Sequence, residues 1–293
     1  MLLLTGATGL VGSALLRRLT AAGQPVRCLV RDPRRLGPDR VRVQIALGDL
    51  ADPPSFRNAM RGVDTVVHLA SAIRDQRVGS IEELNGIATW RMVQAAQRAG
   101  VEHFVYFSSL GAASHDRTRF LRAKALAERA VLDSGVRHTV FSPSLVYAHG
   151  DRFTKLLERI ALLSPVMPVS GRGAALYQPI WAEDVAECVM HALSGCSGRE
   201  RYELAGPQTL SHQQIVALLL RGAGRSRPLV NVPTPIVMRA LRVSEALLKS
   251  RAPTTWDEAE LMEVSMTSSH GTADAEALGV TPRAMAEVLG AAG

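Results

Sequence analysis

The sequence predicts a doubly wound α/β fold built on a parallel sheet, and three observations support this. Short, nearly continuous apolar runs alternate with helical patterns through the first half of the chain. A glycine-rich turn joins the first apolar run to the first helical pattern. The 293 residues, 47% of them hydrophobic, suffice for one large domain with a smaller appendage. Apolar strands separated by helices are typical of a parallel sheet covered on both faces.

The expected strands are the short apolar runs at residues 2–5, 26–30, 41–47, 65–69, 104–107 and 138–141. The first expected helix has one apolar face, formed by Leu10, Val11, Ala14, Leu15 and Leu19. A second apolar face extends from Ile87 to Ala96 and ends before Gly100. In a sheet of this kind, the ligand crevice lies at the C-terminal ends of the strands.

The strongest motif is TGATGLVG at residues 5–12, between the first strand and the first helix. Glycine permits a tight turn, a close approach of backbone to a pyrophosphate and close helix–sheet packing, while the helix N-terminus attracts anions. A glycine-rich turn without a ligand is the less favoured alternative in this strand–loop–helix context. We therefore expect a Rossmann-type fold that binds a dinucleotide through Thr5, Gly6, Thr8, Gly9, Leu10, Val11 and Gly12.

The rhythm of strands and helices changes after Ser142, where prolines and glycines precede a helix at about 183–193 and a mostly helical remainder. We therefore assign residues 1–145 to the dinucleotide-binding core, with 180–196 packing back on it. Residues 146–179 and 197–293 are expected to form a smaller substrate-side region.

The segment after the second strand is expected to select between NAD and NADP. An acidic residue there would bind the ribose hydroxyls of NAD, but Arg31 stands nineteen residues past Gly12. Arg31, together with Arg34 or Arg35, can hold a 2′-phosphate. The neighbouring Asp32 would favour NAD instead. We expect NADP, with NAD as the open alternative.

Composition narrows the function classes. The chain has 34 basic and 27 acidic residues, a formal charge of +7 that suits nucleic acid, an anionic membrane or a phosphorylated ligand. Thirteen aromatic residues are too few for base-stacking platforms, so nucleic acid is not expected. Three cysteines exclude a disulfide scaffold and fit the cytoplasm. The opening does not read as a signal peptide, no apolar run is long enough to cross a membrane, and no histidine spacing predicts a metal site.

Further motifs are spread over nearly the whole chain: GDL at 48–50, VVHLA at 66–70, Asn85, FSSLGA at 107–112, SPSLVY at 142–147, YQPIWAEDVA at 177–186 and YELAGP at 202–207. With TGATGLVG, they make the chain resemble the atypical and extended short-chain dehydrogenase/reductase superfamily. The resemblance is greatest to the NAD(P)-binding group that includes the 39 kDa accessory subunit of respiratory complex I. NmrA-like proteins and sugar-nucleotide epimerases are more distant.

The resemblance implies further contacts with the cofactor. Asp49 and Leu50 would contact the adenine, and Ala70 and Ser71 would line the ribose side. Pro143 through Val146 would flank the nicotinamide.

Catalytic members of the superfamily use a serine with a Tyr-x-x-x-Lys pair, in which the tyrosine moves a proton and the lysine holds the ribose. In this chain Phe120 occupies the tyrosine position and Lys124 the lysine position. Ser109 is preferred over Ser108 as the serine, and Tyr147 is a weaker candidate for a replacement acid. Ser142 also stands where relatives often have an arginine, which disfavours a sugar diphosphate.

These features are consistent with two main candidate functions and with a third. The first is a reductase that passes hydride from NADPH to a quinone or another activated acceptor without the usual tyrosine. The second is a non-catalytic NADPH-binding sensor or accessory subunit, and the third is a sugar-nucleotide epimerase or dehydratase.

A predicted basic amphipathic helix is relevant to what this chain binds. Its expected apolar face holds Ile236, Val237, Ala240, Leu241, Ser244, Leu247 and Leu248. Arg239, Arg242 and Glu245 lie off that face, and Lys249 and Arg251 stand at its end. The helix is expected to cover the substrate crevice; docking on an anionic membrane or on a protein complex is the alternative.

Overall fold

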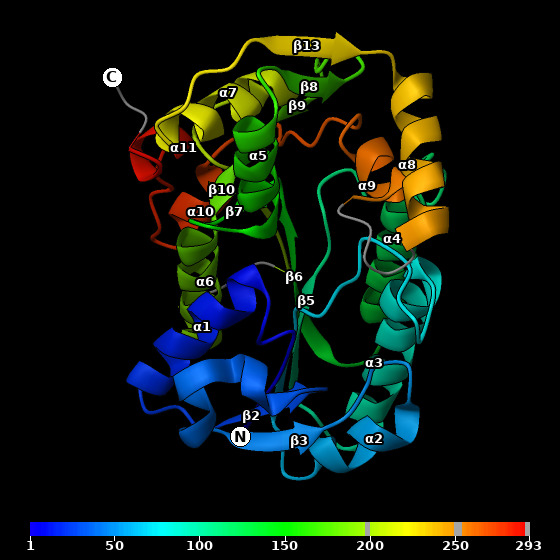
Figure 1. Ribbon diagram of the computed structural model, residues 1–293. Helices are drawn as coiled ribbons and strands as arrows, with labels where there is room; N and C mark the ends of the chain where they lie inside the picture. The colour runs from blue at the N-terminus through cyan, green and yellow to red at the C-terminus, as the bar shows by residue number, and fades with distance from the viewer. Residues whose placement is uncertain (197–199, 249–253, 291–293) are drawn as a thin grey trace.

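The computed structural model describes residues 1–196, 200–248 and 254–290 (Figure 1). Its centre is a seven-stranded sheet in the order β11-β6-β5-β4-β1-β2-β3, with every neighbouring pair parallel. The strands are β1 (Leu2–Thr5), β2 (Val26–Val30), β3 (Gln44–Leu47), β4 (Thr65–His68), β5 (His103–Phe107), β6 (Arg137–Pro143) and β11 (Arg201–Leu204). The predicted doubly wound parallel fold is confirmed.

Alternation along the strands places the core on both faces of the sheet. Leu4, Val67 and Val105 point to the face covered by α1 (Leu10–Ala21) and α6 (Ala182–His191). Leu3 and Val66 point to the opposite face, where α2 (Pro53–Arg57), α3 (Ala88–Arg98) and α4 (Arg119–Leu132) pack. Figure 1 shows these two helical layers on either side of the sheet. The apolar runs lack a polar face because both faces of each strand are buried.

Local boundaries differ from the sequence prediction in two places. The third strand begins at Gln44 rather than at residue 41, because a 3-10 segment, η1 (Pro33–Val41), takes up the preceding residues. The helix containing Ile87 opens with a π turn, η3 (Glu83–Ile87), before α3. Two more short turns are η2 (Asn58–Met60) and η4 (Ala192–Cys196).

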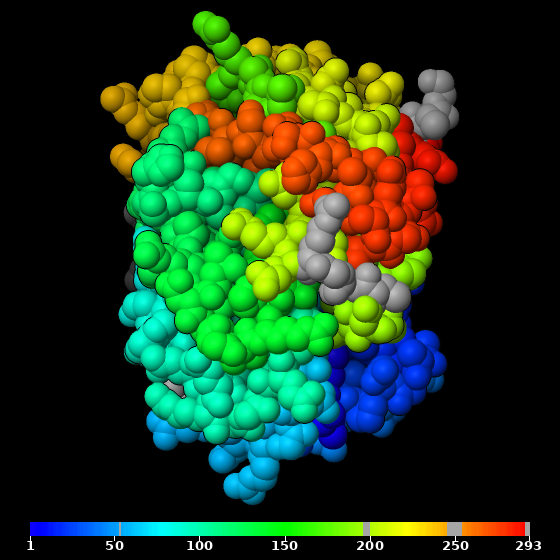
Figure 2. Space-filling model, turned by 180° about the vertical axis from the view of Figure 1, so that it is seen from behind, coloured from blue at the N-terminus to red at the C-terminus, as the bar shows by residue number. Residues whose placement is uncertain are grey.

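The remaining elements build a smaller region at the C-terminal edge of the sheet. Its strand pairs are β7 (Val146–Tyr147) with β10 (Ile180–Trp181), β8 (Met167–Ser170) with β13 (Leu229–Val232), and β9 (Leu176–Tyr177) with β12 (Leu210–Ser211). Its helices are α5 (Arg152–Leu163), α7 (His212–Gly222), α8 (Thr234–Leu248), α9 (Trp256–Leu261) and α11 (Met285–Val288). α10 (Ala273–Ala277) instead packs beside β11, where Ala275 joins the core of the central sheet. In Figure 2 the C-terminal segment, orange to red, crosses the back of the molecule beneath the yellow elements.

The structure corrects one expectation for this second half. β11 lies in the central sheet, although residues 197–293 were assigned to the smaller region; its Tyr202 stacks on Phe141 of β6 at 5.5 Å between ring centroids. The described chain after Arg201 is mostly helical, as expected, with the short strands β11, β12 and β13 among the helices.

Candidate cofactor and substrate pockets

The glycines of the first loop have two different roles. Gly6 has φ +73°, and a Cβ there would lie 2.6 Å from the backbone nitrogen of Ala70. A Cβ on Gly12 would lie 2.1 Å from the carbonyl oxygen of Gly6. These two glycines are therefore required for packing. A Cβ on Gly9 would have one near neighbour, the Gly6 oxygen at 3.3 Å, so Gly9 borders open space.

Helix α1 begins directly after Gly9, which caps it without a side-chain hydrogen bond. The first-turn N–H groups of α1 therefore face the open side of the loop, where a helix N-terminus attracts anions. The Gly9 amide itself donates to the Gly6 carbonyl at 2.9 Å, which keeps the loop tight. This cradle fits the pyrophosphate of a dinucleotide.

A pocket of about 320 Å³ opens at this loop, at the C-terminal ends of β1, β2 and β4. The predicted cofactor residues that line it are Thr5, Gly6, Thr8, Gly9, Arg31, Arg35, Asp49, Leu50, Ala70 and Ser71. Leu10, Pro143 and Val146 line a second pocket instead, and Val11, Gly12 and Arg34 line neither. The sequence motif thus located the loop. It could not show which side chains of the basic segment, residues 31–35, face the pocket.

The basic segment is arranged around Asp32. Its carboxylate accepts a hydrogen bond from the backbone N–H of Arg34 at 3.0 Å and so caps η1. Arg31 lies 4.0 Å from the Asp49 carboxylate, measured between Nη1 and Oδ2, and half of its side chain is exposed. Asp32 lines the pocket together with Arg31 and Arg35, so side chains for both cofactor alternatives lie at it. One oxygen of the Asp32 carboxylate is engaged with backbone, whereas two arginines are available for a 2′-phosphate.

Thr5 positions the loop through its side chain. Its hydroxyl lies 2.7 Å from Nδ1 of His68 and accepts from the Ala70 N–H at 3.3 Å. The other ring nitrogen of His68 lies 3.0 Å from the hydroxyl of Thr89. Burial, with a further contribution from the charge of Lys124, lowers the pKa of His68 to about 3. A neutral His68 therefore ties the ends of β1 and β4 together.

Asn85 holds the segment that separates the two pockets. Its side-chain oxygen accepts from the Ser71 hydroxyl at 2.8 Å and from the Ala72 N–H at 3.1 Å. Its amide donates to the carbonyls of Ala72 at 2.7 Å and Ile81 at 2.8 Å. Asn85 lies in the π turn η3, and that geometry turns its amide toward this segment.

The second pocket, of about 460 Å³, adjoins the first and shares Leu69 and Ser71 with it. Its walls come from loops after β5 and β6 and from α4, α5, α7 and α9. Most of the lining is apolar: Leu10, Leu69, Ile73, Phe107, Phe120, Pro143, Leu145, Val146, Phe153, Leu156, Ile215, Leu219, Leu261, Met262, Met266 and Met285. The arrangement suits a lipophilic ligand beside a dinucleotide.

Lys124 is a wall residue of this pocket, not an ordinary solvated lysine. It is 4% exposed, and its ammonium donates to the Phe107 carbonyl at 2.7 Å. Its Nζ lies 5.2 Å from the ring centre of Tyr106 and 5.7 Å from that of Phe120. Burial lowers the pKa of Lys124 to about 7, against the opposing effect of Glu128. Phe120 therefore lies beside the lysine without offering it a hydroxyl.

The two serines after β5 differ in their partners. The Ser108 hydroxyl donates to the Glu128 carboxylate, which also pairs with Arg201. The Ser109 hydroxyl makes only long contacts, 3.3 Å to the Leu110 carbonyl and 4.0 Å to the sulfur of Met266. Ser109 is thus freer than Ser108 to turn toward a ligand in the second pocket.

Tyr147 is 3% exposed and lines the second pocket. Within the described residues its hydroxyl has no hydrogen-bond partner. Burial raises the pKa of Tyr147, so the phenol stays protonated. It is therefore a donor for a polar atom of a ligand.

Sequence reasoning did not identify His212, which also lines the second pocket. It is 8% exposed and lies between the rings of Phe153 and Tyr177, at 6.1 and 6.5 Å between centroids. Burial lowers its pKa, which favours the neutral ring. A single histidine at the start of a helix carries no recognisable motif, so no signal in the sequence could have found it.

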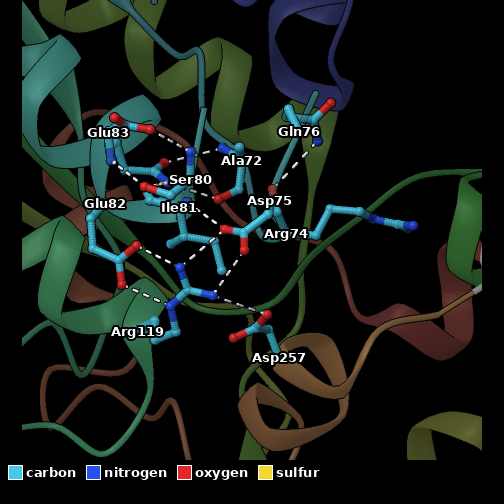
Figure 3. Close-up of polar contacts among 11 residues, drawn as sticks. Ala72, Arg74, Asp75, Gln76, Ser80, Ile81, Glu82, Glu83, Arg119 and Asp257 are labelled. Atoms are coloured by element: carbon cyan, nitrogen blue, oxygen red, sulfur yellow. Dashed lines mark hydrogen bonds and ion pairs between the residues drawn. The ribbon is translucent and has the colours of Figure 1, made fainter. Parts of the chain in front are cut away.

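Ion pairs join α9 to α4 and to the segment that follows β4; Figure 3 shows those of Arg119. Arg119 at the start of α4 pairs with Asp75 at 3.1 Å, Glu82 at 2.7 Å and Asp257 at 3.6 Å. The buried pair of Arg74 and Glu258, at 2.8 Å, makes a second tie. Glu258 lines the pocket, so these contacts decide its shape.

The described side chains of helix α8 (residues 234–244) do not have the role expected for them. None of its described side chains lines either pocket, and α9 supplies lining residues instead. The side chains of Leu247 and Leu248 are not among those described, and Lys249 and Arg251 lie outside the described residues. No helix in the described part of the chain is long and apolar enough to cross a membrane. The same residues contain no cluster of three or more metal-binding side chains.

Known proteins provide an independent comparison. The chain is 32% identical to an NAD(P)H azoreductase from Xenophilus azovorans, over 77% of this chain and 74% of that protein. It is 28% identical to the mitochondrial NADH dehydrogenase [ubiquinone] 1 alpha subcomplex subunit 9 of Arabidopsis thaliana, over 85% of this chain and 64% of that subunit.

Solved structures support the fold. An NADPH-dependent quinone oxidoreductase from Escherichia coli, complexed with NADPH, superposes with a TM-score of 0.73 at 19% identity, over 99% of both chains. A nucleoside-diphosphate-sugar epimerase from Staphylococcus aureus gives 0.75 at 17% identity, over 98% of this chain and 99% of that one.

A family model described as NAD(P)H-binding matches residues 6–194, which span the glycine loop, the sheet and α6. Together with the relatives above, this match means that the chain belongs to the NAD(P)H-binding family, within the atypical short-chain dehydrogenase/reductase group.

Proposed function

We propose that this protein is a reductase that uses NADPH to reduce a lipophilic, activated acceptor such as a quinone. The observation that carries the proposal is the apolar pocket beside the dinucleotide pocket, with Phe120 where a tyrosine acid would stand. The bound cofactor would supply hydride. Hydride and one proton from water convert a quinone to a hydroquinone, so no strong protein acid is required and positioning becomes the main task.

Different residues would position the cofactor and the acceptor. The backbone of the glycine loop would hold the pyrophosphate, and Arg31 and Arg35 would hold the 2′-phosphate. Lys124 would bind the nicotinamide ribose from the wall of the second pocket. Ser109 and Tyr147 would donate hydrogen bonds to the acceptor oxygens, while Phe120 excludes water. The activity in the name of the Xenophilus relative, an NAD(P)H azoreductase, supports reduction of an activated acceptor.

A second candidate is a non-catalytic NADPH-binding sensor or accessory subunit. The absence of a tyrosine at position 120 and the 28% identity to the Arabidopsis complex subunit favour it. Epimerase or dehydratase chemistry ranks third, because such reactions depend on the tyrosine that Phe120 replaces.

A single-turnover assay separates these candidates. Protein loaded with NADPH would be mixed with quinones, enones and aldehydes while the reduced-nicotinamide absorbance is followed. We expect rapid oxidation with a quinone and slow oxidation with simple aldehydes. Gly9→Asp places a carboxylate at the phosphate site and should abolish the reaction, whereas Gly9→Ala should retain it. Tight NADPH binding without oxidation by any acceptor would contradict the reductase and favour the sensor.

A further inference from the structure

The charge of this protein is concentrated in two segments. Residues 159–176 and 221–244 contain no aspartate or glutamate and seven arginines: Arg159, Arg172, Arg221, Arg225, Arg227, Arg239 and Arg242. The whole chain has 34 basic and 27 acidic residues, so the remainder holds 27 of each. These two segments therefore carry a net charge equal to that of the entire protein.

The fold joins these segments into one surface, here called the cap. β8 pairs in parallel with β13, with Met167 opposite Leu229. The Nε of Arg227 donates to the Ala161 carbonyl at 3.1 Å, which ties the end of α5 to the start of β13. Figure 1 shows α5, β8, β13 and the beginning of α8 gathered at the end of the molecule opposite β2 and β3.

The cap also exposes apolar side chains. Leu163 is 90% exposed, Leu162 61%, Val243 59% and Ile236 57%. Val166, Leu176 and Val230 are also exposed. Seven of the sixteen exposed large hydrophobic residues in the described part of the chain thus lie in the cap. An accumulation of this kind indicates an interaction surface.

Helix α8 carries both exposed apolar side chains and arginines. Ile236, Arg239, Ala240 and Val243 follow helical spacing, and all four are exposed. Arg242 is exposed beside them, 5.6 Å from the ring centre of Trp256. An outward face of apolar side chains flanked by arginines is typical of a helix that lies in a lipid headgroup layer.

Carboxylates flank the two segments. Glu158 precedes the first segment and Glu245 follows the second. Glu263 accepts hydrogen bonds from Thr234 at 2.6 Å and from Ser170 at 3.2 Å, and its other oxygen lies 3.8 Å from Arg117. Glu263 is therefore engaged with residues at the base of the cap.

We propose that the cap docks this protein on the surface of an anionic lipid bilayer. The apolar tips would enter the headgroup boundary, and the arginines would pair with lipid phosphates. A bilayer fits better than a protein partner because the two segments carry seven arginines and no carboxylate of their own, as a surface that meets lipid phosphates requires. The proposal does not depend on the reductase activity.

Docking through the cap would bring the second pocket close to the lipid. Leu156 lines that pocket, and Leu163 lies on the same face of α5 two turns later, about 10 Å along the helix axis. α7 likewise contributes Ile215 and Leu219 to the pocket and ends at the cap. A lipophilic acceptor dissolved in the bilayer would therefore have a short path to the pocket.

Vesicle cosedimentation of the purified chain tests the proposal without NADPH or acceptor, so its result is independent of the assay for reductase activity. The vesicles would contain equimolar phosphatidylcholine and phosphatidylglycerol, or phosphatidylcholine alone. The charge variant is Arg221→Glu with Arg239→Glu. Its control, Arg40→Glu with Arg42→Glu, makes the same charge change on exposed residues far from the cap in the chain. Leu163→Ser is paired with Val41→Ser, since Val41 is 81% exposed.

We expect binding to the anionic vesicles that weakens as salt is raised. The Arg221 and Arg239 variant should bind at least about tenfold more weakly, and Leu163→Ser about threefold more weakly, while both controls bind like wild type. Circular dichroism would verify that each variant is folded. Absence of binding, equal binding to phosphatidylcholine alone, or equal losses in cap and control variants would overturn the proposal; the first outcome would direct attention to a protein partner.

Discussion

The two pockets lie side by side but are built in different ways. The dinucleotide pocket is formed by the backbone of a glycine loop and by segments that follow successive strands of one sheet. The second pocket is formed largely by side chains from α4, α5, α7 and α9, which are distant in sequence. Ion pairs join α9 to α4 and to the segment that contains Arg74. A site made of backbone can be encoded by a short motif, whereas a site made of side chains depends on how distant elements pack.

The largest expected effect tests the backbone-built pocket. Gly12→Ala should lower the free energy of unfolding by about 3 kcal/mol or more, because its Cβ would lie 2.1 Å from a backbone oxygen that cannot move away. Gly9→Ala should cost less than about 1 kcal/mol, since the nearest atom is at 3.3 Å. Urea denaturation of both variants measures the difference. Equal losses would mean that the two glycines do not have separate roles.

The next largest expected effect tests the second pocket, which is built from side chains. Phe120→Tyr places a phenol beside Lys124 and should raise aldehyde reduction by about a hundredfold, the usual contribution of a positioned general acid. Phe153→Tyr adds the same hydroxyl to another wall of the pocket and should give no gain. Steady-state rates with NADPH and an aromatic aldehyde would measure both. A Phe120→Tyr variant without new activity would show that the catalytic register is misassigned.

A smaller effect tests how the first pocket selects its cofactor. Arg31→Ala or Arg35→Ala should weaken NADPH binding about tenfold and leave NADH binding unchanged, because each removes a charged hydrogen bond to a 2′-phosphate. Arg34→Ala is the matched control, since Arg34 does not line the pocket. Fluorescence titration with the two cofactors would measure these affinities. Equal losses for NADPH and NADH would contradict a 2′-phosphate site.

The last effect is a pH dependence of stability from Lys124, in the wall of the second pocket. Burial lowers the pKa of Lys124 from 10.5 to about 7, so between these values the unfolded chain holds more protons than the native one. The free energy of unfolding should therefore increase as the pH rises through this range, by about 1 kcal/mol per pH unit from this group.

Lys124→Met should remove this contribution, and Lys155→Met, at an exposed position, should keep it. Urea denaturation of the three proteins between about pH 7 and about pH 9 would measure the slopes. Identical slopes in wild type and Lys124→Met would mean that the lysine is hydrated in solution.

The sequence by itself determined the sheet and the phosphate loop. Buried strands of a parallel sheet are apolar on both faces, and the loop needs glycine where a Cβ would collide, so both leave local signals. Phe120 and Lys124 could also be placed on one helix face from their spacing.

Only the tertiary structure decided the rest. It placed β11 in the central sheet, brought His212 and Glu258 to the second pocket, and gave α9 a place in its wall, where none of the described side chains of α8 lies. It also joined two arginine-rich segments, separated by more than forty residues, into one cap. These features depend on contacts between distant elements, and no local spacing or periodicity records which element a side chain will meet.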